Sequence, residues 1–500
     1  MSHPWLSRSL LRQALPYMSK TVSSAANKST KDLERVAAHC RALSSGQTPR
    51  FYLPLVFINL DPTSIPQPSD AEEAAELAFA RGLAALEIMN GVANIPLPAL
   101  QELWAGVWPW LLFIEAQAQI QRPDLERHQL NAVLLGPLTL MARDSDESTI
   151  QLVLSSSGIL PFLGRRWDLL HGDPLTEESS RNAALAIHGI LRFADFSNQA
   201  ATLDEIAEGL RDGTPDLIRL IVDGIGAVFP AKPAPGLKLP LLPTLYSLMP
   251  IVKAALGREG FDGLFTLGVV TNTTKLLIPL CGMGKIDLLE QSLAVLGPLL
   301  AFLPRYAAVA ESLDARLFPA LATILLDRRA NAVSKEVILT ILCDILPAAR
   351  VFRPVVSAAK KSLEATNGRG RNFVCHRPDP DITRAWRIVG ELYNDTVDEL
   401  EAYEKLGSAR KQIAKRLSPG ESSAVVRLAA SRSTATSDAS VKPGKTGISF
   451  SARRYLRLTA TPAPNTNTTS PPMTSASCTI SSWRTTTITA RGSTTATGLV

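Results

Sequence analysis

The stretch ESLDARLFPALATILLDRRANAVSKEVILTILCDILP, residues 311–347, is the clearest pattern in the chain and reads as two helices. In its first half, apolar residues recur at three- and four-residue spacing, which places them on one helical face: Leu313, Leu317, Leu321, Ile324 and Leu325. After a polar break at Asp327–Asn331, the second half repeats the pattern with Val337, Ile338, Ile341 and Ile345. Each apolar stripe is too wide to face water, so the pair must pack against other helices.

Similar helical patterns recur through most of the chain. Helix pairs return about every 40 residues, which is the period of HEAT and armadillo arrays, and no series of alternating strands interrupts them. The sequence therefore predicts an all-α, armadillo/HEAT-like helical-repeat array over residues 31–365. The expected helices cover 31–43, 69–90, 100–121, 124–143, 148–167 (two segments parted by Gly158), 175–196, 203–213, 215–228, 241–256, 261–280, 286–302 and 351–364.

The remaining segments differ from this pattern. Residues 1–30 are expected to be flexible, and the apolar run at 51–60 to form a short buried helix or an extended connector. Ser69 and Glu72 have the spacing of a capping box that would begin the helix at 69–90. Residues 366–381 are expected to form a basic loop, and residues 382–417 a polar helix that caps the array.

Residues 418–500 are expected to be a disordered tail. Of the last 80 residues, 31 are Ser or Thr, and such a composition cannot bury enough apolar surface to fold. After Gly420 the tail carries 9 basic and 2 acidic residues, whereas the rest of the chain has 43 basic and 44 acidic residues. The basic balance therefore belongs to the tail, and the neutral body argues against a nucleic-acid partner.

Cysteine usage and hydropathy indicate the redox compartment of the chain and its relation to membranes. The cysteines are scattered and form no CxxC pair, which fits free thiols in a reducing compartment. The most apolar run, Leu103–Ile114, contains Pro109 and is far shorter than the ~20 residues that span a bilayer. We therefore expect a cytoplasmic or nuclear protein without a membrane partner.

Two segments contain part of a phosphate-binding loop motif. Gly282-Met283-Gly284-Lys285 lacks the Ser/Thr after the lysine and the leading glycine, and Gly444-Lys445-Thr446 has no strand before it. Both are interpreted as loops that bind no nucleotide. His39-Cys40 and Cys375-His376 are neighbours in sequence, which rarely reach one metal ion, so neither pair predicts a zinc site.

Other chemically capable residues favour structural roles. His188 lies in an apolar helix and is interpreted as a hydrogen-bonded core histidine, and Cys343 as a packed core thiol. The tryptophans Trp104, Trp108 and Trp110 are expected in the core, with a groove as the alternative. A phosphate or an acidic partner is the alternative to a solvated loop for Arg369, Arg371 and Arg377.

Three phrases of the chain resemble a large group of fungal (mushroom-type) proteins: LERVAAHCRAL at 33–43, FYLPLVFINLDPTSIPQP at 51–68 and GILPFLGRRWDLL at 158–170. Those proteins have an armadillo-like helical body followed by a C-terminal MYND-type zinc finger, and the resemblance covers most of residues 1–417. It implies a protein-interaction module, because fingers of this type bind short peptides. Such a finger needs many cysteines, whereas this chain has only Cys478 after Cys375, so no zinc ligand can be assigned.

The tail suggests why the finger is absent. In a frame shifted by one nucleotide, Thr codons become Tyr, His, Asn or Asp codons, and Ala codons become Cys, Arg, Ser or Gly codons. The segment STATS at 433–437 could then encode aromatic residues and cysteine. This motivates the hypothesis that the tail is an out-of-frame relic of a zinc finger, which the transcript would disprove if that frame is full of stops or lacks cysteine.

The sequence as a whole favours a non-enzymatic scaffold that binds a protein or peptide partner, with no metal, cofactor or small-molecule substrate. One alternative is a zinc-finger adaptor or transcriptional co-regulator whose finger, and zinc, exist only in the other frame. A second alternative is an all-helical enzyme that uses dispersed acids such as Asp314, Asp327 and Asp344. No acids paired at i, i+4 on an inward helix face support this enzyme, and no catalytic residue is assigned.

Overall fold

The computed structural model describes residues 3–43, 48–122, 127–143, 146–171, 178–196, 200–230, 236–301, 306–327, 332–370 and 380–416. Within these ranges the chain is helical and has no β-strand, and Thr48 and Val92 form an isolated bridge. The predicted all-α helical-repeat array is therefore confirmed. Residues 1–409 form one compact unit, which contains all the contacts discussed below.

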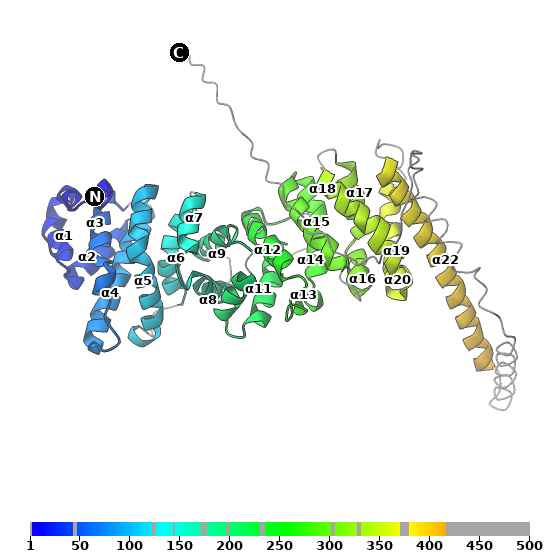
Figure 1. Ribbon diagram of the computed structural model, residues 1–500, viewed down its shortest axis with the longest axis horizontal. Helices are drawn as coiled ribbons and strands as arrows, with labels where there is room; N and C mark the ends of the chain where they lie inside the picture. The colour runs from blue at the N-terminus through cyan, green and yellow to red at the C-terminus, as the bar shows by residue number, and fades with distance from the viewer. Residues whose placement is uncertain are drawn as a thin grey trace, which may run out of the picture. The chain divides into compact units, whose positions relative to one another are not determined.

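One row of helices runs through this unit, and each member contacts the next (Figure 1). The row consists of α2 (Thr30–Ala42), α4 (Glu72–Gly91), α6 (Arg127–Arg143), α9 (Glu178–Leu191), α12 (Leu242–Ala255), α15 (Ile286–Ala301) and α18 (Ala332–Thr340). Contact between successive members explains why these helices carry broad apolar faces, since each one buries surface against two neighbours in the row.

A second row packs beside the first, and its members also contact one another in order. It consists of α5 (Leu97–Gln121), α7 (Glu147–Leu154), α8 (Ile159–His171), α11 (Thr214–Ala227), α14 (Val269–Gly282), α17 (Leu317–Leu326) and α20 (Arg353–Gly370). Contacts such as α4 with α5, α8 with α9 and α14 with α15 join the two rows into one continuous core. The further helices are α1 (Ser19–Ala26), α3 (Leu53–Asn59), α10 (Ala200–Glu208), α13 (Gly263–Thr266), α16 (Tyr306–Asp314), α19 (Leu346–Ala349) and α22 (Pro380–Arg416).

The stretch at 311–347 contributes helices to both rows, but it has one more break between helices than its sequence predicts. Leu313 lies near the end of α16, and Leu317 is the first residue of α17. The helix breaks between them because Arg316 adopts a left-handed conformation (φ 73°). The five apolar residues of the first half are nevertheless all buried. In the second half, α18 continues through a π-helical turn at Ile341–Ile345 into α19.

The N-terminal residues differ from the expected flexible segment. Pro4–Leu6, Arg8–Gln13 and Pro16–Met18 form 3₁₀ helices, and α1 follows. Val22 and Ala25 are fully buried against the body. The sequence misleads here because short 3₁₀ turns leave no apolar period to recognise.

Two further predictions at segment boundaries are wrong, and a third segment takes one of its two expected forms. The expected capping box does not form: α4 begins at Glu72 with Ala71 as its N-cap, and no side chain caps it. The expected basic loop at 366–381 is partly helical, because α20 extends to Gly370 and α22 begins at Pro380. The segment at 51–60, for which two forms were open, is the buried helix α3.

The polar helix α22 packs on the last repeat through its first half. Trp386 and Tyr393 both contact the ring of Phe318 on α17, edge to face, and the Tyr393 hydroxyl donates a 2.7 Å hydrogen bond to the Leu346 carbonyl. Farther along α22, Glu401 and Glu404 form ion pairs with Lys360 and Arg353 of α20. The first half of α22 therefore packs on α17 and α19 through Trp386 and Tyr393, whereas its second half meets α20 through ion pairs.

Candidate binding groove

A wide groove lies over α4, between its neighbours α2 and α6. Its volume is about 980 Å³, and the end of α5 closes one side of it. The α4 side chains that line it recur at helical spacing along one face: Glu76, Phe79, Ala80, Leu83, Ala84, Glu87 and Asn90. We call this feature the α4 groove.

The floor of the α4 groove is apolar and made of small or half-buried side chains. Ala80 and Leu83 of α4 and Val133 of α6 are each half-buried, whereas Phe79 beneath them is buried. This surface stays partly exposed, whereas Ala85, Leu86, Ile88 and Met89 in the second half of α4 are completely buried. An apolar floor between two helices is the form of groove that receives an amphipathic helix or an extended peptide.

Charged side chains border this floor. Lys31, Glu34, Arg35 and Arg41 come from α2, and Arg122 follows the end of α5. Arg41 lies 3.4 Å from the carboxylate of Glu87 on α4. Burial raises the pKa of Glu87, although the charges of Arg41 and Arg122 act in the opposite direction. The groove therefore has an apolar centre and a rim of mixed charge, which resembles the anatomy of protein interfaces.

Close contacts hold α4 in position beneath the groove. The Asn90 side-chain amide donates a 3.1 Å hydrogen bond to the Val133 carbonyl of α6. A Cβ at Gly136 would lie 2.2 Å from the Asn90 amide group, so a larger residue there would displace this amide and disturb its hydrogen bond. On the opposite side, a Cβ at Gly82 would lie 2.6 Å from the ring of Trp110.

A buried polar cluster joins three helices at one turn of the array. Arg165 and Arg166 of α8 both donate to the carboxylate of Glu115 on α5, and Arg166 also donates a 2.9 Å hydrogen bond to the Asn131 side chain on α6. Burial would raise the pKa of Glu115, but the hydrogen bonds and charges of the two arginines outweigh it and lower this pKa. Every charge in the cluster faces an opposite charge, so its role is to fix the packing of α5, α6 and α8.

His188 occupies the core position that the sequence predicts. Its Nδ1 lies 2.7 Å from the Ser247 hydroxyl of α12, and its ring meets Trp167 edge to face. The Ser247 hydroxyl in turn donates to the Thr244 carbonyl. Complete burial lowers the pKa of His188 to about 4. Both residues are buried, and the cavity beside them measures only about 40 Å³, so this contact links α9 to α12 and leaves no room for a substrate.

The three tryptophans lie in the core, as expected. Trp104 and Trp108 stack with their rings 5.7 Å apart and donate to Ser156 and to the Ser157 carbonyl in the turn after α7. Trp110 is completely buried and donates to the Asp61 carbonyl. Their indole N–H groups therefore tie α5 to the loops on either side of it, and none of the three lines the α4 groove.

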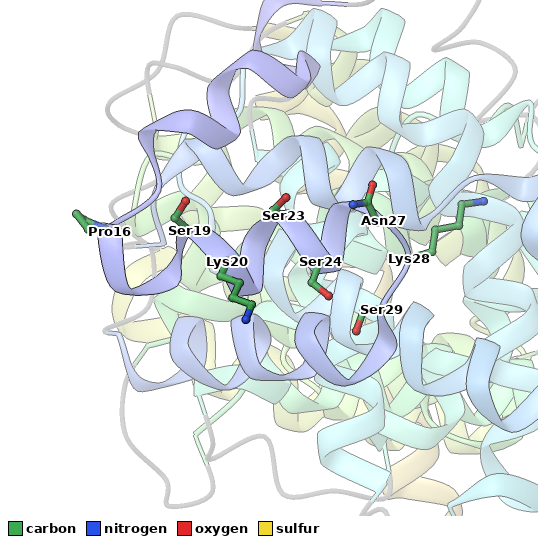
Figure 2. Close-up of a pocket in the computed structure, with 8 residues that line it drawn as sticks. All are labelled: Pro16, Ser19, Lys20, Ser23, Ser24, Asn27, Lys28 and Ser29. Atoms are coloured by element: carbon green, nitrogen blue, oxygen red, sulfur yellow. The ribbon is translucent and has the colours of Figure 1, made fainter.

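Two further hollows lie at the N-terminal end. One, of about 750 Å³, follows α1 and is lined mainly by serines and two lysines. Figure 2 shows that Ser19, Ser23 and Asn27 project to one side of α1, whereas Lys20 and Ser24 project to the other, so these groups do not converge on one point. The second, of about 690 Å³, lies between the first turns, α3 and α5.

The remaining sequence candidates have structural surroundings. Gly282–Lys285 is the turn between α14 and α15, in which Gly284 has φ 68° and the Lys285 N–H donates to the Leu280 carbonyl. Cys40 is buried, whereas Cys343 is half-buried on the π-helical turn. Asp314 pairs with Lys361, whereas Asp327 contacts the Cys281 thiol. In the part of the chain that the structure describes, no three His, Cys, Asp or Glu side chains gather in a way that could hold a metal ion.

Several candidates fall outside the described residues. These are Arg371, Cys375, His376, Arg377, the Gly444–Thr446 segment, Cys478 and the rest of the tail from residue 417, together with the side chain of Arg369. Among the described helices, none is long and apolar enough to cross a bilayer. Comparison of the chain with models of protein families, with curated proteins and with solved structures finds no match.

Proposed function

We propose that this protein is a non-enzymatic interaction scaffold whose α4 groove binds a peptide segment of a partner protein. The observation that carries the proposal is the half-buried apolar stripe of Ala80, Leu83 and Val133 inside a groove of about 980 Å³. Leu83 and Val133 pack against the core on one side but stay half-exposed on the side that faces the groove. An apolar peptide face that covers it would remove this surface from water, at about 25 cal/mol for each Å².

The rim suggests what the bound segment looks like. The α2 side chains at the rim are three bases and one acid, Lys31, Arg35, Arg41 and Glu34, and Glu76 of α4 adds a second acid. A helix with one apolar face and charges of both signs along its edges fits this arrangement. The mixed rim would select register and orientation, while the apolar contact would supply most of the affinity.

The experiment places a photo-crosslinking amino acid in the full-length chain. One variant carries it at Ala80, on the groove floor, and a matched variant carries it at Ala201, an exposed position on α10. The proposal predicts that one partner segment crosslinks from position 80 and that the same segment is absent from crosslinks at position 201. Equal crosslinking from both positions, or none from position 80, would contradict it.

A further inference from the structure

The second half of α22 has large apolar side chains that no described part of the chain covers. Tyr403 is 76% exposed and Leu406 is 62% exposed. They lie three residues apart and therefore share one side of the helix. Glu404, which pairs with Arg353 of α20, precedes Leu406 by two residues, so Leu406 points away from the body of the array.

Charge is segregated along the same helix. Between residues 394 and 404 there are five acids and no base, and between 405 and 416 there are five bases and no acid. The acids are Asp395, Asp398, Glu399, Glu401 and Glu404, and the bases are Lys405, Arg410, Lys411, Lys415 and Arg416. Tyr403 and Leu406 therefore lie where the sign of the charge changes.

Such a helix is complementary to a second copy of itself in the antiparallel direction. If two copies cross near Lys405 and Leu406, the acidic block of each lies beside the basic block of the other. A parallel pair would instead place like charges side by side. An antiparallel pair of identical helices has a two-fold axis, so both copies use the same surface and the contact closes after two chains.

Gly407, next to Leu406, is consistent with a close helix crossing. Glycine inside a helix costs about 1 kcal/mol relative to alanine. A Cβ built at Gly407 meets no atom of the described residues within 4 Å, so contacts among these residues do not explain the glycine. A second helix that crosses at this point would approach most closely where the side chain is absent.

We propose that α22 forms an antiparallel, isologous helix pair with α22 of a second copy, with Tyr403 and Leu406 at its centre. The charge order alone has another explanation, because bases near a helix C-terminus and the Glu401–Lys405 pair also stabilise an isolated helix. That explanation leaves the exposed Tyr403 and Leu406 without a role. The paired segment at 395–416 is about 33 Å long, so we expect a weak, salt-sensitive dimer with Kd on the order of micromolar.

The experiment is sedimentation velocity of the full-length chain at several concentrations, at low and at high salt. Asp398 and Glu399 are exposed and lie outside the ion pairs with α20, so D398K/E399K reverses the charge of two of the five acids without breaking these pairs and brings the acidic block from −5 to −1. K411E/K415E likewise reverses the charge of two of the five bases and brings the basic block from +5 to +1. The matched control is E205K/E208K, which makes the same charge change at exposed positions of α10.

The wild type and the control should dimerise alike, more weakly at high salt. Each reversed variant should dimerise about tenfold more weakly or worse, and an equimolar mixture of the two should form heterodimers. Circular dichroism checks that the variants fold, and Y403A/L406A, which leaves the charges intact, should also yield monomers. The proposal would be overturned if the wild type stays monomeric at a protein concentration 100-fold above the expected Kd. It would also be overturned if either charge-reversal variant dimerises like the control, or if the mixture of the two stays monomeric.

Discussion

Arg166 of α8 and Glu115 of α5, which lie 51 residues apart, form a buried ion pair in the interior of the array. The Arg166 side chain is only 6% exposed, whereas Arg165, which binds the same carboxylate from the other side, is 40% exposed. The two arginines thus offer a matched comparison on a single acid, since one is desolvated and the other is in contact with water.

Removing the buried partner should destabilise the array more than removing the exposed one. R166M leaves the Glu115 carboxylate with one partner in a desolvated site, and we expect a loss of about 3–5 kcal/mol in the free energy of unfolding. R165M should cost about 1 kcal/mol or less, because water can replace its contact. Urea denaturation followed by circular dichroism measures both, and equal losses would contradict this assignment.

Acid should weaken the fold through His188 before it affects the carboxylates. The pKa of His188 is about 4 in the folded chain and about 6.5 when unfolded, so the unfolded chain binds the extra proton between these values. The stabilisation that comes from a neutral His188 is therefore complete above pH 6.5. As the pH falls to 4, this group lowers the free energy of unfolding by about 3 kcal/mol in all. H188Q, whose amide can still bond to Ser247, should flatten the stability profile between pH 6.5 and 4.5.

The lowered pKa of Glu115 acts in a different pH window. Its stabilisation is present above the ordinary carboxylate pKa and is lost only as the pH falls below it. A stability profile that stays flat from pH 7 to 5 in the wild type, or one that H188Q leaves unchanged, would contradict the account of His188.

Two glycines set the distance between α8 and the end of α10. A Cβ at Gly164 would lie 2.3 Å from the Ile206 carbonyl oxygen, and a Cβ at Gly209 would lie 2.0 Å from the Pro161 carbonyl oxygen. Because backbone atoms cannot yield as a flexible side chain can, G164A and G209A should each destabilise the protein by about 1–3 kcal/mol.

The control for this pair is Gly282, at the end of α14, where a Cβ would meet nothing within 4 Å. G282A should leave the stability unchanged or raise it by up to about 1 kcal/mol. If G282A lowers the free energy of unfolding as much as G164A does, then intrinsic backbone effects explain the lost stability, and the approach of α8 to α10 does not.

Local apolar spacing was enough to predict the all-α array, although not the break at Arg316 between α16 and α17. Leu317, Leu321 and Ile324 recur at helical spacing and are all buried, because one helical period suffices to build a packed face. His188 was placed correctly for a similar reason, since its neighbours in sequence are apolar and continue the buried face of α9.

Features that depend on distant residues could not be predicted. Ser69 has the right spacing from Glu72 for a cap, yet the chain turns at 67–70 and α4 begins two residues later than a cap at Ser69 requires. Nothing in the local sequence shows that Arg166 meets Glu115. The α4 groove likewise arises where α2 and α6 flank α4, so its lining is split among segments up to 100 residues apart.

The most direct test of the proposed function measures the affinity of the full-length chain for the partner segment that crosslinks at position 80. Isothermal titration calorimetry would compare the wild type, L83E on the groove floor, and A201E on the exposed surface of α10. A buried, unpaired carboxylate on the floor should weaken binding by about 100-fold, whereas A201E should bind like the wild type. If L83E folds and binds the segment as tightly as A201E, the α4 groove is not the binding site.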